Sequence, residues 1–142
     1  WVVKTTRTKP EVVLDLPDRL EVVGRRGPVH QIMVNLVQNA IDVMAEQPEP
    51  KLIVSAACEG QWVVVRVRDF GPGLSATAMK RLFEPFFTTK PIGKGTGLGL
   101  YVSYGLAEEL GGQLDGANHE EGGAIFTLRL PAQEAPGASI GR

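Results

Sequence analysis

The stretch from Gly93 to Leu100 reads Gly-Lys-Gly-Thr-Gly-Leu-Gly-Leu, so every second residue is a glycine. Holding glycine in one conformation costs entropy, and a cluster this dense is typical of a backbone that closely approaches a ligand. Apolar residues at helical spacing follow and predict a helix from Gly97 to Leu110. The first N–H groups and the positive dipole end of that helix would face the glycines and favour an anion such as phosphate. A glycine-rich surface turn without a ligand is the alternative.

Familiar glycine motifs do not account for this chain. Gly93-Lys94 resembles the end of a Walker loop, but Gly95 stands where Ser or Thr should follow. The segment Gly71–Ala76 fits a relaxed dinucleotide-binding pattern, yet its second residue is a proline that removes an N–H from the turn. Asp69-Phe70-Gly71 matches the metal-binding triplet of protein kinases, but no His-Arg-Asp catalytic loop accompanies it. A P-loop, a dinucleotide fold and a protein-kinase fold are therefore disfavoured.

Composition limits the class of protein. A chain of 142 residues with 43% hydrophobic content suits one domain with a proper core. A net charge of −1 gives no general attraction to nucleic acid or to an anionic membrane, so neither is expected as a partner. Cys58 is the single cysteine, which argues against disulfides and a cysteine zinc site, and no apolar run could span a bilayer. We expect a cytoplasmic domain, with an inner-membrane sensor as one option for the parent protein.

The pattern of apolar residues divides the chain into three parts. Residues 1–10 are interpreted as a lead-in from a preceding domain, residues 11–131 as one domain, and residues 132–142 as a disordered tail. The domain is predicted to be α+β, a two-layer sandwich whose mixed, mostly antiparallel sheet is covered on one face by three helices. The predicted strands are 12–14 and 20–23 with a turn between them, 52–57, 62–68, 113–118 and 124–130. The predicted helices are 29–44, 75–83 with Ser75 as cap, and 97–110. A mobile loop is expected from residue 85 to residue 96.

Amide side chains share one side of the helix predicted from Val29 to Met44. Asn35 and Asn39 are four residues apart, with Gln31 and Asp42 about one turn away in either direction. Amide oxygens suit a hard cation such as magnesium, which keeps few protein ligands and takes phosphate oxygens as well. The alternative is an ordinary solvated helix face.

Asp69 ends a strand of valines, where a carboxylate is costly unless it finds hydrogen-bond donors. The amino group of adenine is one such donor. The alternative is that Asp69 only starts the turn at Gly71-Pro72-Gly73, and both can hold together.

Four segments together resemble the N, first glycine, phenylalanine and second glycine boxes of sensor histidine kinases. The resemblance covers about residues 11–131 and is to the catalytic ATP-binding domain, whose Bergerat fold is shared with gyrase, Hsp90 and MutL. The sequence of the phenylalanine box resembles that of nitrogen- and dicarboxylate-sensing kinases. The four segments are Asn35–Ala40, Asp69–Gly73, Leu82–Lys90 and Gly95–Leu100.

The resemblance implies a role for each matching residue. Asn35 and Asn39 would be the catalytic residues, with Asn39 coordinating Mg²⁺ and Asn35 supporting the phosphates, while Asp69 would accept from the adenine amino group. The segment from Leu74 to Thr96 would form a lid docked by Phe83, Phe86 and Phe87, although plain core packing is the favoured interpretation for at least one phenylalanine. The implied nucleotide contacts are Asn35, Asn39, Asp69, Gly71, Gly73, Leu74, Lys90, Lys94, Gly95, Thr96, Gly97, Leu98, Gly99 and Leu100.

Two departures from the family pattern matter. Hydrolytic relatives carry a Glu at the position of Asn35, and an amide cannot accept a proton from water, so fast ATP hydrolysis is not expected. Asp42 stands where another family pattern has a basic residue, which puts contacts of Asp42 and Val43 with the nucleotide in doubt. No segment resembles a phosphoacceptor box, and His30 and His119 are interpreted as surface or packing residues.

The resemblance therefore implies a domain that binds Mg-ATP and donates the γ-phosphate to a histidine on a separate dimerisation domain of its parent. A response regulator would be the next acceptor, and the isolated chain should not phosphorylate itself. A docking module that has lost ATP, and a serine-kinase relative of the same superfamily, are the alternatives.

Overall fold

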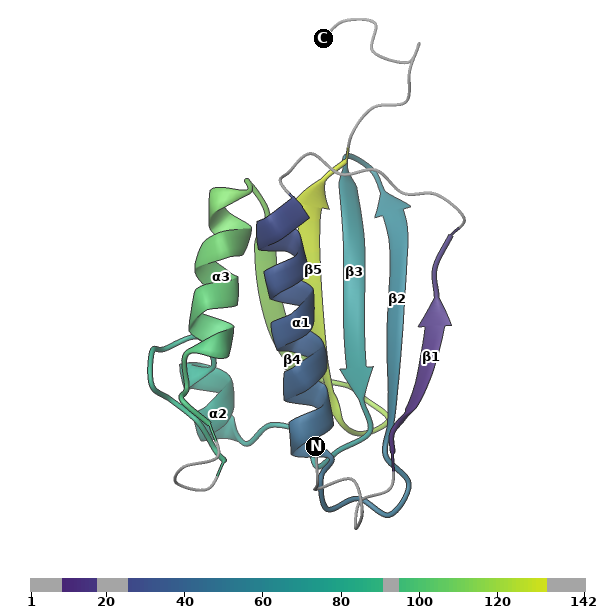
Figure 1. Cartoon of the computed structure of the whole chain (residues 1–142), viewed down its shortest axis with the longest axis vertical. Helices are drawn as coiled ribbons and strands as arrows, with labels where there is room; N and C mark the ends of the chain where they lie inside the picture. The colour runs from purple at the N-terminus through teal and green to yellow at the C-terminus, as the bar shows by residue number, and fades with distance from the viewer. Residues whose placement is uncertain (1–8, 18–25, 91–94, 133–142) are drawn as a thin grey trace, which may run out of the picture.

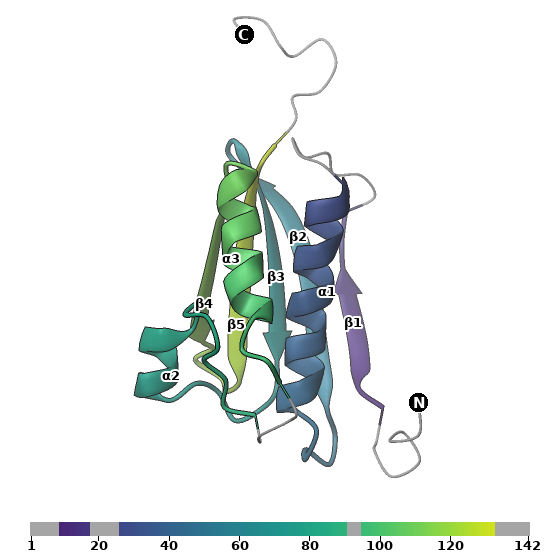
Figure 2. The same cartoon turned by 60° about the vertical axis from the view of Figure 1, so that its left-hand side comes forward.

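The computed structural model describes residues 9–17, 26–90 and 95–132. Its elements form two layers, a five-stranded sheet and a layer of helices on one of its faces (Figures 1 and 2). The predicted α+β two-layer fold is confirmed. In chain order the elements are β1 (Glu11–Asp15), α1 (Arg26–Val43), β2 (Lys51–Glu59), β3 (Trp62–Asp69), α2 (Ala76–Arg81), α3 (Gly99–Glu109), β4 (Gln113–Asn118) and β5 (Ala124–Pro131).

The sheet is mixed, with the strand order β1-β2-β3-β5-β4. β1 runs parallel to β2, and every other neighbouring pair is antiparallel. Strands β3 and β5 are neighbours in the sheet, although α2, α3 and β4 lie between them in the chain. Residues 20–23, the partner predicted for the first strand, lie outside the described residues; the partner that the structure gives β1 is β2.

α1 and α3 lie next to each other over the sheet, and α2 lies beside the lower end of β4 and β5 in Figure 1. α1 buries Ile32, Leu36 and Ala40, at the four-residue spacing of a helix with one apolar face, and Met44 directly after the helix is buried as well. The sheet contributes Phe126, Leu128 and Leu130 from alternate positions of β5. The core therefore lies between these two layers.

The helix boundaries differ from the sequence prediction by a few residues, and the starts of α1 and α3 do so for local reasons. α1 begins at Arg26 instead of Val29, because Pro28 then falls in the first turn, where a helix does not use the backbone N–H. α3 begins at Gly99 instead of Gly97, because Gly97 has a φ of 73° and cannot be part of a right-handed helix. α2 is shorter than predicted, although Ser75 caps it as expected by accepting from the Ala78 N–H.

No helix within the described ranges is both long and apolar enough to cross a membrane. His30 is exposed and His119 is half-buried, which agrees with their interpretation as surface or packing residues.

Candidate functional site

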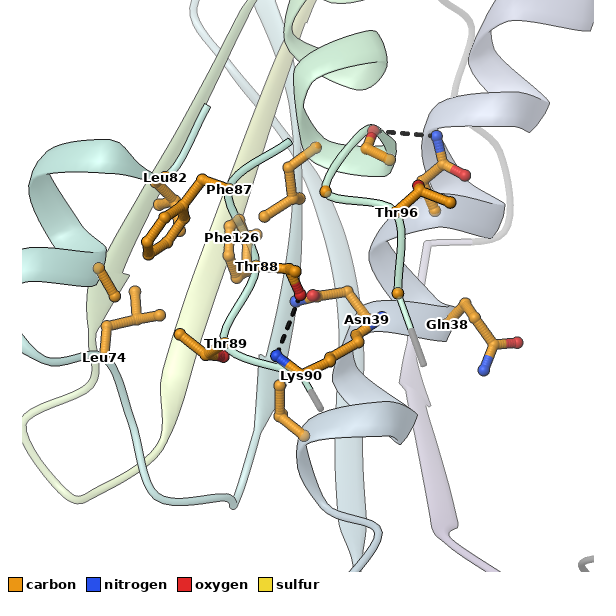
Figure 3. Close-up of a pocket in the computed structure, with 17 residues that line it drawn as sticks. Gln38, Asn39, Leu74, Leu82, Phe87, Thr88, Thr89, Lys90, Thr96 and Phe126 are labelled. Atoms are coloured by element: carbon orange, nitrogen blue, oxygen red, sulfur yellow. Dashed lines mark hydrogen bonds between the residues drawn. The ribbon is translucent and has the colours of Figure 1, made fainter. Parts of the chain in front are cut away.

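A cavity of about 290 Å³ opens between α1, α2 and the two loop segments that flank the undescribed residues 91–94 (Figure 3). Its volume lies near the lower end of the range of about 300–1,000 Å³ that is usual for small-molecule sites. Residues from all four predicted boxes or from their immediate surroundings line it. The lining residues are Asn35, Gln38, Asn39, Val43, Leu74, Ala78, Leu82, Phe87, Thr88, Thr89, Lys90, Gly95, Thr96, Gly97, Gly99, Leu100 and Phe126.

Asp69 ends β3 with only 2% of its surface exposed. Its Oδ1 accepts from the backbone N–H groups of Gly71 at 2.9 Å and Ala124 at 3.2 Å. Burial raises the pKa of Asp69, and the two N–H groups and the charge of Arg68 oppose that rise. No described residue donates to Oδ2. One oxygen of this buried carboxylate is thus held by the backbone and the other is available as an acceptor.

Asp69, Gly71 and Gly73 do not themselves line the cavity but adjoin it. A Cβ built on Gly71 would lie 3.4 Å from the side chain of Val43, which is a lining residue, and 3.1 Å from Oδ1 of Asp69. The first glycine of this turn thus lets the backbone pass between the carboxylate and α1. Three residues later, Leu74 reaches the cavity wall (Figure 3).

Asn118, at the end of β4, forms hydrogen bonds with the turn after Asp69, a contact that the sequence did not predict. Its Oδ1 accepts from the Leu74 N–H at 2.6 Å, and its Nδ2 donates to the Leu74 carbonyl at 2.9 Å. Gly73 has a φ of 82°, and a Cβ there would lie 2.9 Å from Oδ1 of Asn118. Gly123 was also missed; it has a φ of 79°, and a Cβ there would overlap the carbonyl of Asp69. The Gly122-Gly123 pair before β5 was the available signal in the sequence.

Asn35 joins α1 to the start of α3. Its Nδ2 donates to the Gly99 carbonyl at 3.1 Å and to Oγ of the fully buried Ser103 at 2.9 Å, and its Oδ1 accepts from Gln31. Asn35 is therefore placed to fix the first turn of α3 relative to α1. A direct contact of Asn35 with phosphate stays a prediction.

Asn39 lies one turn further along α1 and points into the cavity (Figure 3). Its side chain makes no hydrogen bond with any residue that the structure describes, so its oxygen is available to a ligand. The described part of the chain holds no group of three or more His, Cys, Asp or Glu residues that could bind a metal. A cation here would depend on Asn39 and on oxygen atoms of the ligand itself.

The glycine-rich segment is anchored to the phenylalanine box. Gly97 accepts from the N–H of Phe86 at 2.9 Å, and a Cβ on Gly97 would overlap the Phe86 backbone. The following Leu98 precedes α3 without capping it by its side chain, while its own N–H donates to Oγ1 of Thr96 at 3.2 Å. Gly99 and Leu100 therefore present an uncapped helix start at the cavity, as an anion site requires.

The three phenylalanines have three different environments. Phe83 packs against the core and stacks on Tyr104 at a centroid distance of 4.9 Å, which fits the core-packing reading. Phe87 lines the cavity, with the guanidinium of Arg81 over its ring. Phe86 is 74% exposed and has a φ of 66°, a left-handed conformation unusual for its residue type. A lid movement of these residues stays a prediction.

Lys90 lines the cavity (Figure 3). Its Nζ donates to Oδ2 of Asp42 at 2.6 Å. Asp42 itself does not line the cavity. Lys94, the other lysine predicted to reach phosphate, lies outside the described residues.

The sequence profile described as "Histidine kinase-, DNA gyrase B-, and HSP90-like ATPase" matches residues 24–134. The chain belongs to this family of ATPases. The resemblance seen in the four boxes is thereby confirmed.

Among curated relatives of this ATPase domain, the C4-dicarboxylate transport sensor protein DctB of Pseudomonas aeruginosa is 43% identical over 122 residues, which cover 84% of this chain and 20% of DctB. Eight curated relatives are sensor proteins or kinases, of whose length the chain spans only 12–24%.

Solved structures of histidine kinases share the same fold. The catalytic domain of histidine kinase ThkA matches with a TM-score of 0.74 and 32% identity, over 85% of this chain and 79% of that one. Full-length ShkA in complex with AMPPNP matches with a TM-score of 0.73 and 28% identity, over 88% of this chain and 26% of that one. The predicted Bergerat fold is thus confirmed.

Proposed function

We propose that this chain binds Mg-ATP and presents the γ-phosphate to a histidine on a separate dimerisation domain of a sensor histidine kinase. The observation that carries the proposal is that two unlike ends meet at one cavity. The base end comprises Asp69, Gly71, Leu74, Asn118 and Gly123, and it offers a buried carboxylate oxygen next to an apolar wall. The phosphate end comprises Asn39, Lys90, Gly95, Gly97 and Gly99, and it offers an amide, a cation and an uncapped helix start.

The residues present fit this ligand. Oδ2 of Asp69 can accept from an adenine amino group while Oδ1 stays bound to the backbone. Asn39 suits magnesium, and Lys90 and the N–H groups near Gly99 suit phosphate oxygens. Bound magnesium would neutralise charge on the phosphates, and the protein groups would contribute positioning and further neutralisation.

Asn35 bears on whether the γ-phosphate is hydrolysed or transferred. The side chain of Asn35 uses both amide hydrogens on α3 and cannot take a proton from water at neutral pH. We therefore expect slow hydrolysis of ATP and transfer of the γ-phosphate to an acceptor outside this domain. A response regulator would receive it from that histidine in the full-length protein.

Calorimetric titration with ADP and AMPPNP, with and without magnesium, tests the binding step. We expect AMPPNP binding that strengthens with magnesium, and an Asn39→Ala variant that loses most of the magnesium effect. His30→Ala is the matched control, because it removes an exposed polar side chain from the same helix outside the cavity lining. Absence of binding at millimolar ligand by the folded wild type would favour the docking module.

Labelled ATP tests the transfer step. The isolated chain should take up no phosphate, whereas a dimerisation domain with an acceptor histidine, added in trans, should become labelled on an acid-labile site. Labelling of an acid-stable serine instead would support the serine-kinase alternative. Labelling of the isolated chain would contradict the proposal.

A further inference from the structure

Asp42 lies on α1 one turn after Asn39, and both of its carboxylate oxygens are engaged. Oδ2 accepts from Nζ of Lys90 at 2.6 Å, and Oδ1 accepts from Nε2 of Gln38 at 2.8 Å. The side chains of Lys90 and Asp42 are 26% and 25% exposed. This ion pair is therefore better shielded from solvent than Arg66–Glu59 or Arg81–Glu84. A shielded pair with a defined geometry contributes more free energy than an exposed one.

Lys90 is held at two further points. Its backbone N–H donates to Oγ1 of Thr88 at 3.0 Å. Its aliphatic stem lies against Gly95, where a Cβ would come within 2.6 Å of Cδ of Lys90. An ammonium has three hydrogens, and only the one on Asp42 has a partner among the described residues. Lys90 can thus keep Asp42 and still donate into the cavity.

The sign of the charge on Asp42 makes this arrangement informative. A carboxylate near a phosphate site repels the ligand, so by Coulomb's law alone its removal should tighten the binding of ATP. A carboxylate that holds a lysine in place has the opposite effect on ATP affinity. Without the carboxylate, the lysine side chain is mobile in the free protein and loses conformational entropy when it binds the phosphate.

We propose that Asp42 is a positioning residue that fixes the Lys90 ammonium at the phosphate end of the cavity. The inference rests on the proposed function. The position of the ammonium at the phosphate end then depends on two residues, Asp42 on α1 and Lys90 in the phenylalanine box, which lie 48 positions apart in the chain.

Titration of the same chain with AMPPNP and magnesium tests this. Asp42→Ala should weaken binding by about three- to tenfold in the presence of Lys90, which corresponds to about 0.7–1.4 kcal/mol. With Lys90→Met already in place, Asp42→Ala should instead tighten binding, because only the repulsion is then removed. The reversal of sign is the result that a merely structural role of Asp42 would not produce.

Asp115→Ala is the matched control. Asp115 is likewise a member of an ion pair, with Arg129 at 3.1 Å, but it lies on β4 and does not line the cavity, so AMPPNP affinity should stay unchanged. Adenosine, which has no phosphates, should bind all variants equally. Thermal melting of each variant shows whether it is folded, and Asp42→Asn replaces the alanine variant if the latter is not.

Each outcome decides one question. If the wild type does not bind AMPPNP, the proposed function is wrong and this inference falls with it. If the wild type binds and Asp42→Ala tightens or does not change binding in the presence of Lys90, the proposed function stands and the positioning role of Asp42 is wrong. An equal loss in both backgrounds would likewise overturn it.

Discussion

The two ends of the cavity are built by different means. At the base end, Asp69 is held by backbone N–H groups of a turn and of the neighbouring strand β5, and Gly123 is packed against its carbonyl. At the phosphate end, Lys90 is held by side chains and by a loop that the structure attaches at Phe86 and Gly97. The base end is therefore an extension of the sheet, whereas the phosphate end depends on contacts outside regular structure.

This difference predicts how each end responds to change. Disturbing the base end should alter the stability of the whole domain, because its hydrogen bonds tie the end of β3 to the start of β5. Disturbing the phosphate end should mainly alter ligand affinity, because loops that carry function open at low free-energy cost. The variants below test this contrast.

Gly123→Ala should have the largest effect. The new Cβ would overlap the Asp69 carbonyl, and the φ of 79° is strained for alanine, so we expect a loss of about 3 kcal/mol or more in the free energy of unfolding. Urea denaturation measures this. Gly122→Ala, with a φ of 107° but no atom within 4 Å, separates strain from overlap and should cost only about 1–2 kcal/mol. Equal losses for the two variants would contradict the packing argument.

Asp69→Asn should separate stability from binding at the base end. The amide oxygen can still accept from Gly71 and Ala124, and the cost of burying a charge disappears, so the melting temperature should rise. The amide hydrogens would meet the adenine amino group, so ATP affinity should fall about 10- to 100-fold, as expected for about 1.5–3 kcal/mol. Calorimetry with inorganic triphosphate, whose affinity should not change, is the control; equal losses for both ligands would argue against an adenine contact.

Gly97→Ala tests the phosphate end. Its Cβ would overlap the backbone of Phe86 and force the glycine-rich segment away from the phenylalanine box. We expect AMPPNP affinity to fall about tenfold, equal to about 1.4 kcal/mol, with a smaller change in melting temperature than for Gly123→Ala. Gly105→Ala on α3, where no atom lies within 4 Å, should leave affinity unchanged. A larger loss of stability from Gly97→Ala than from Gly123→Ala would reverse the comparison.

The smallest expected effect is a pH dependence of the base end. Burial raises the pKa of Asp69 in the folded state above its ordinary value of 3.8, so the folded state holds the proton more tightly than the unfolded state. Its contribution to stability is therefore favourable at low pH, declines as pH rises from about 3.8 through the raised pKa, and is constant above it. Melting temperatures of wild type and Asp69→Asn should converge in acid and diverge toward neutral pH; a gap independent of pH would refute this.

Local patterns predicted much of the fold. The apolar spacing of α1, the valine-rich strands and the Ser75 cap all depend on residues a few positions apart, and the structure confirms them. The four boxes converge on one cavity as the resemblance implied, except that Asp69, Gly71 and Gly73 adjoin its wall and Leu98 does not line it. The contacts of these residues with nucleotide stay predictions, and Lys94 lies outside the described residues.

What escaped prediction depends on contacts between distant residues. The parallel pairing of β1 with β2 follows from a crossover, which apolar alternation cannot reveal. The clamp of Asn118 on Leu74 and the pair of Lys90 with Asp42 join residues 44 and 48 positions apart. Asparagine in a strand end and aspartate on a helix carry no local signal of such partners.

The pairing of β3 with β5 makes the chain from residue 70 to residue 123 one long connection between two neighbouring strands. The hydrogen bond between Asp69 and Ala124 closes this connection, which contains α2, the glycine-rich segment, α3 and the edge strand β4. Closing so long a loop early in folding is entropically costly, which places the β3–β5 contact among the slow, non-local steps. A ligand that grips Asp69 at one end of this connection and Gly99 within it would shorten the effective loop, so nucleotide should slow unfolding of the domain.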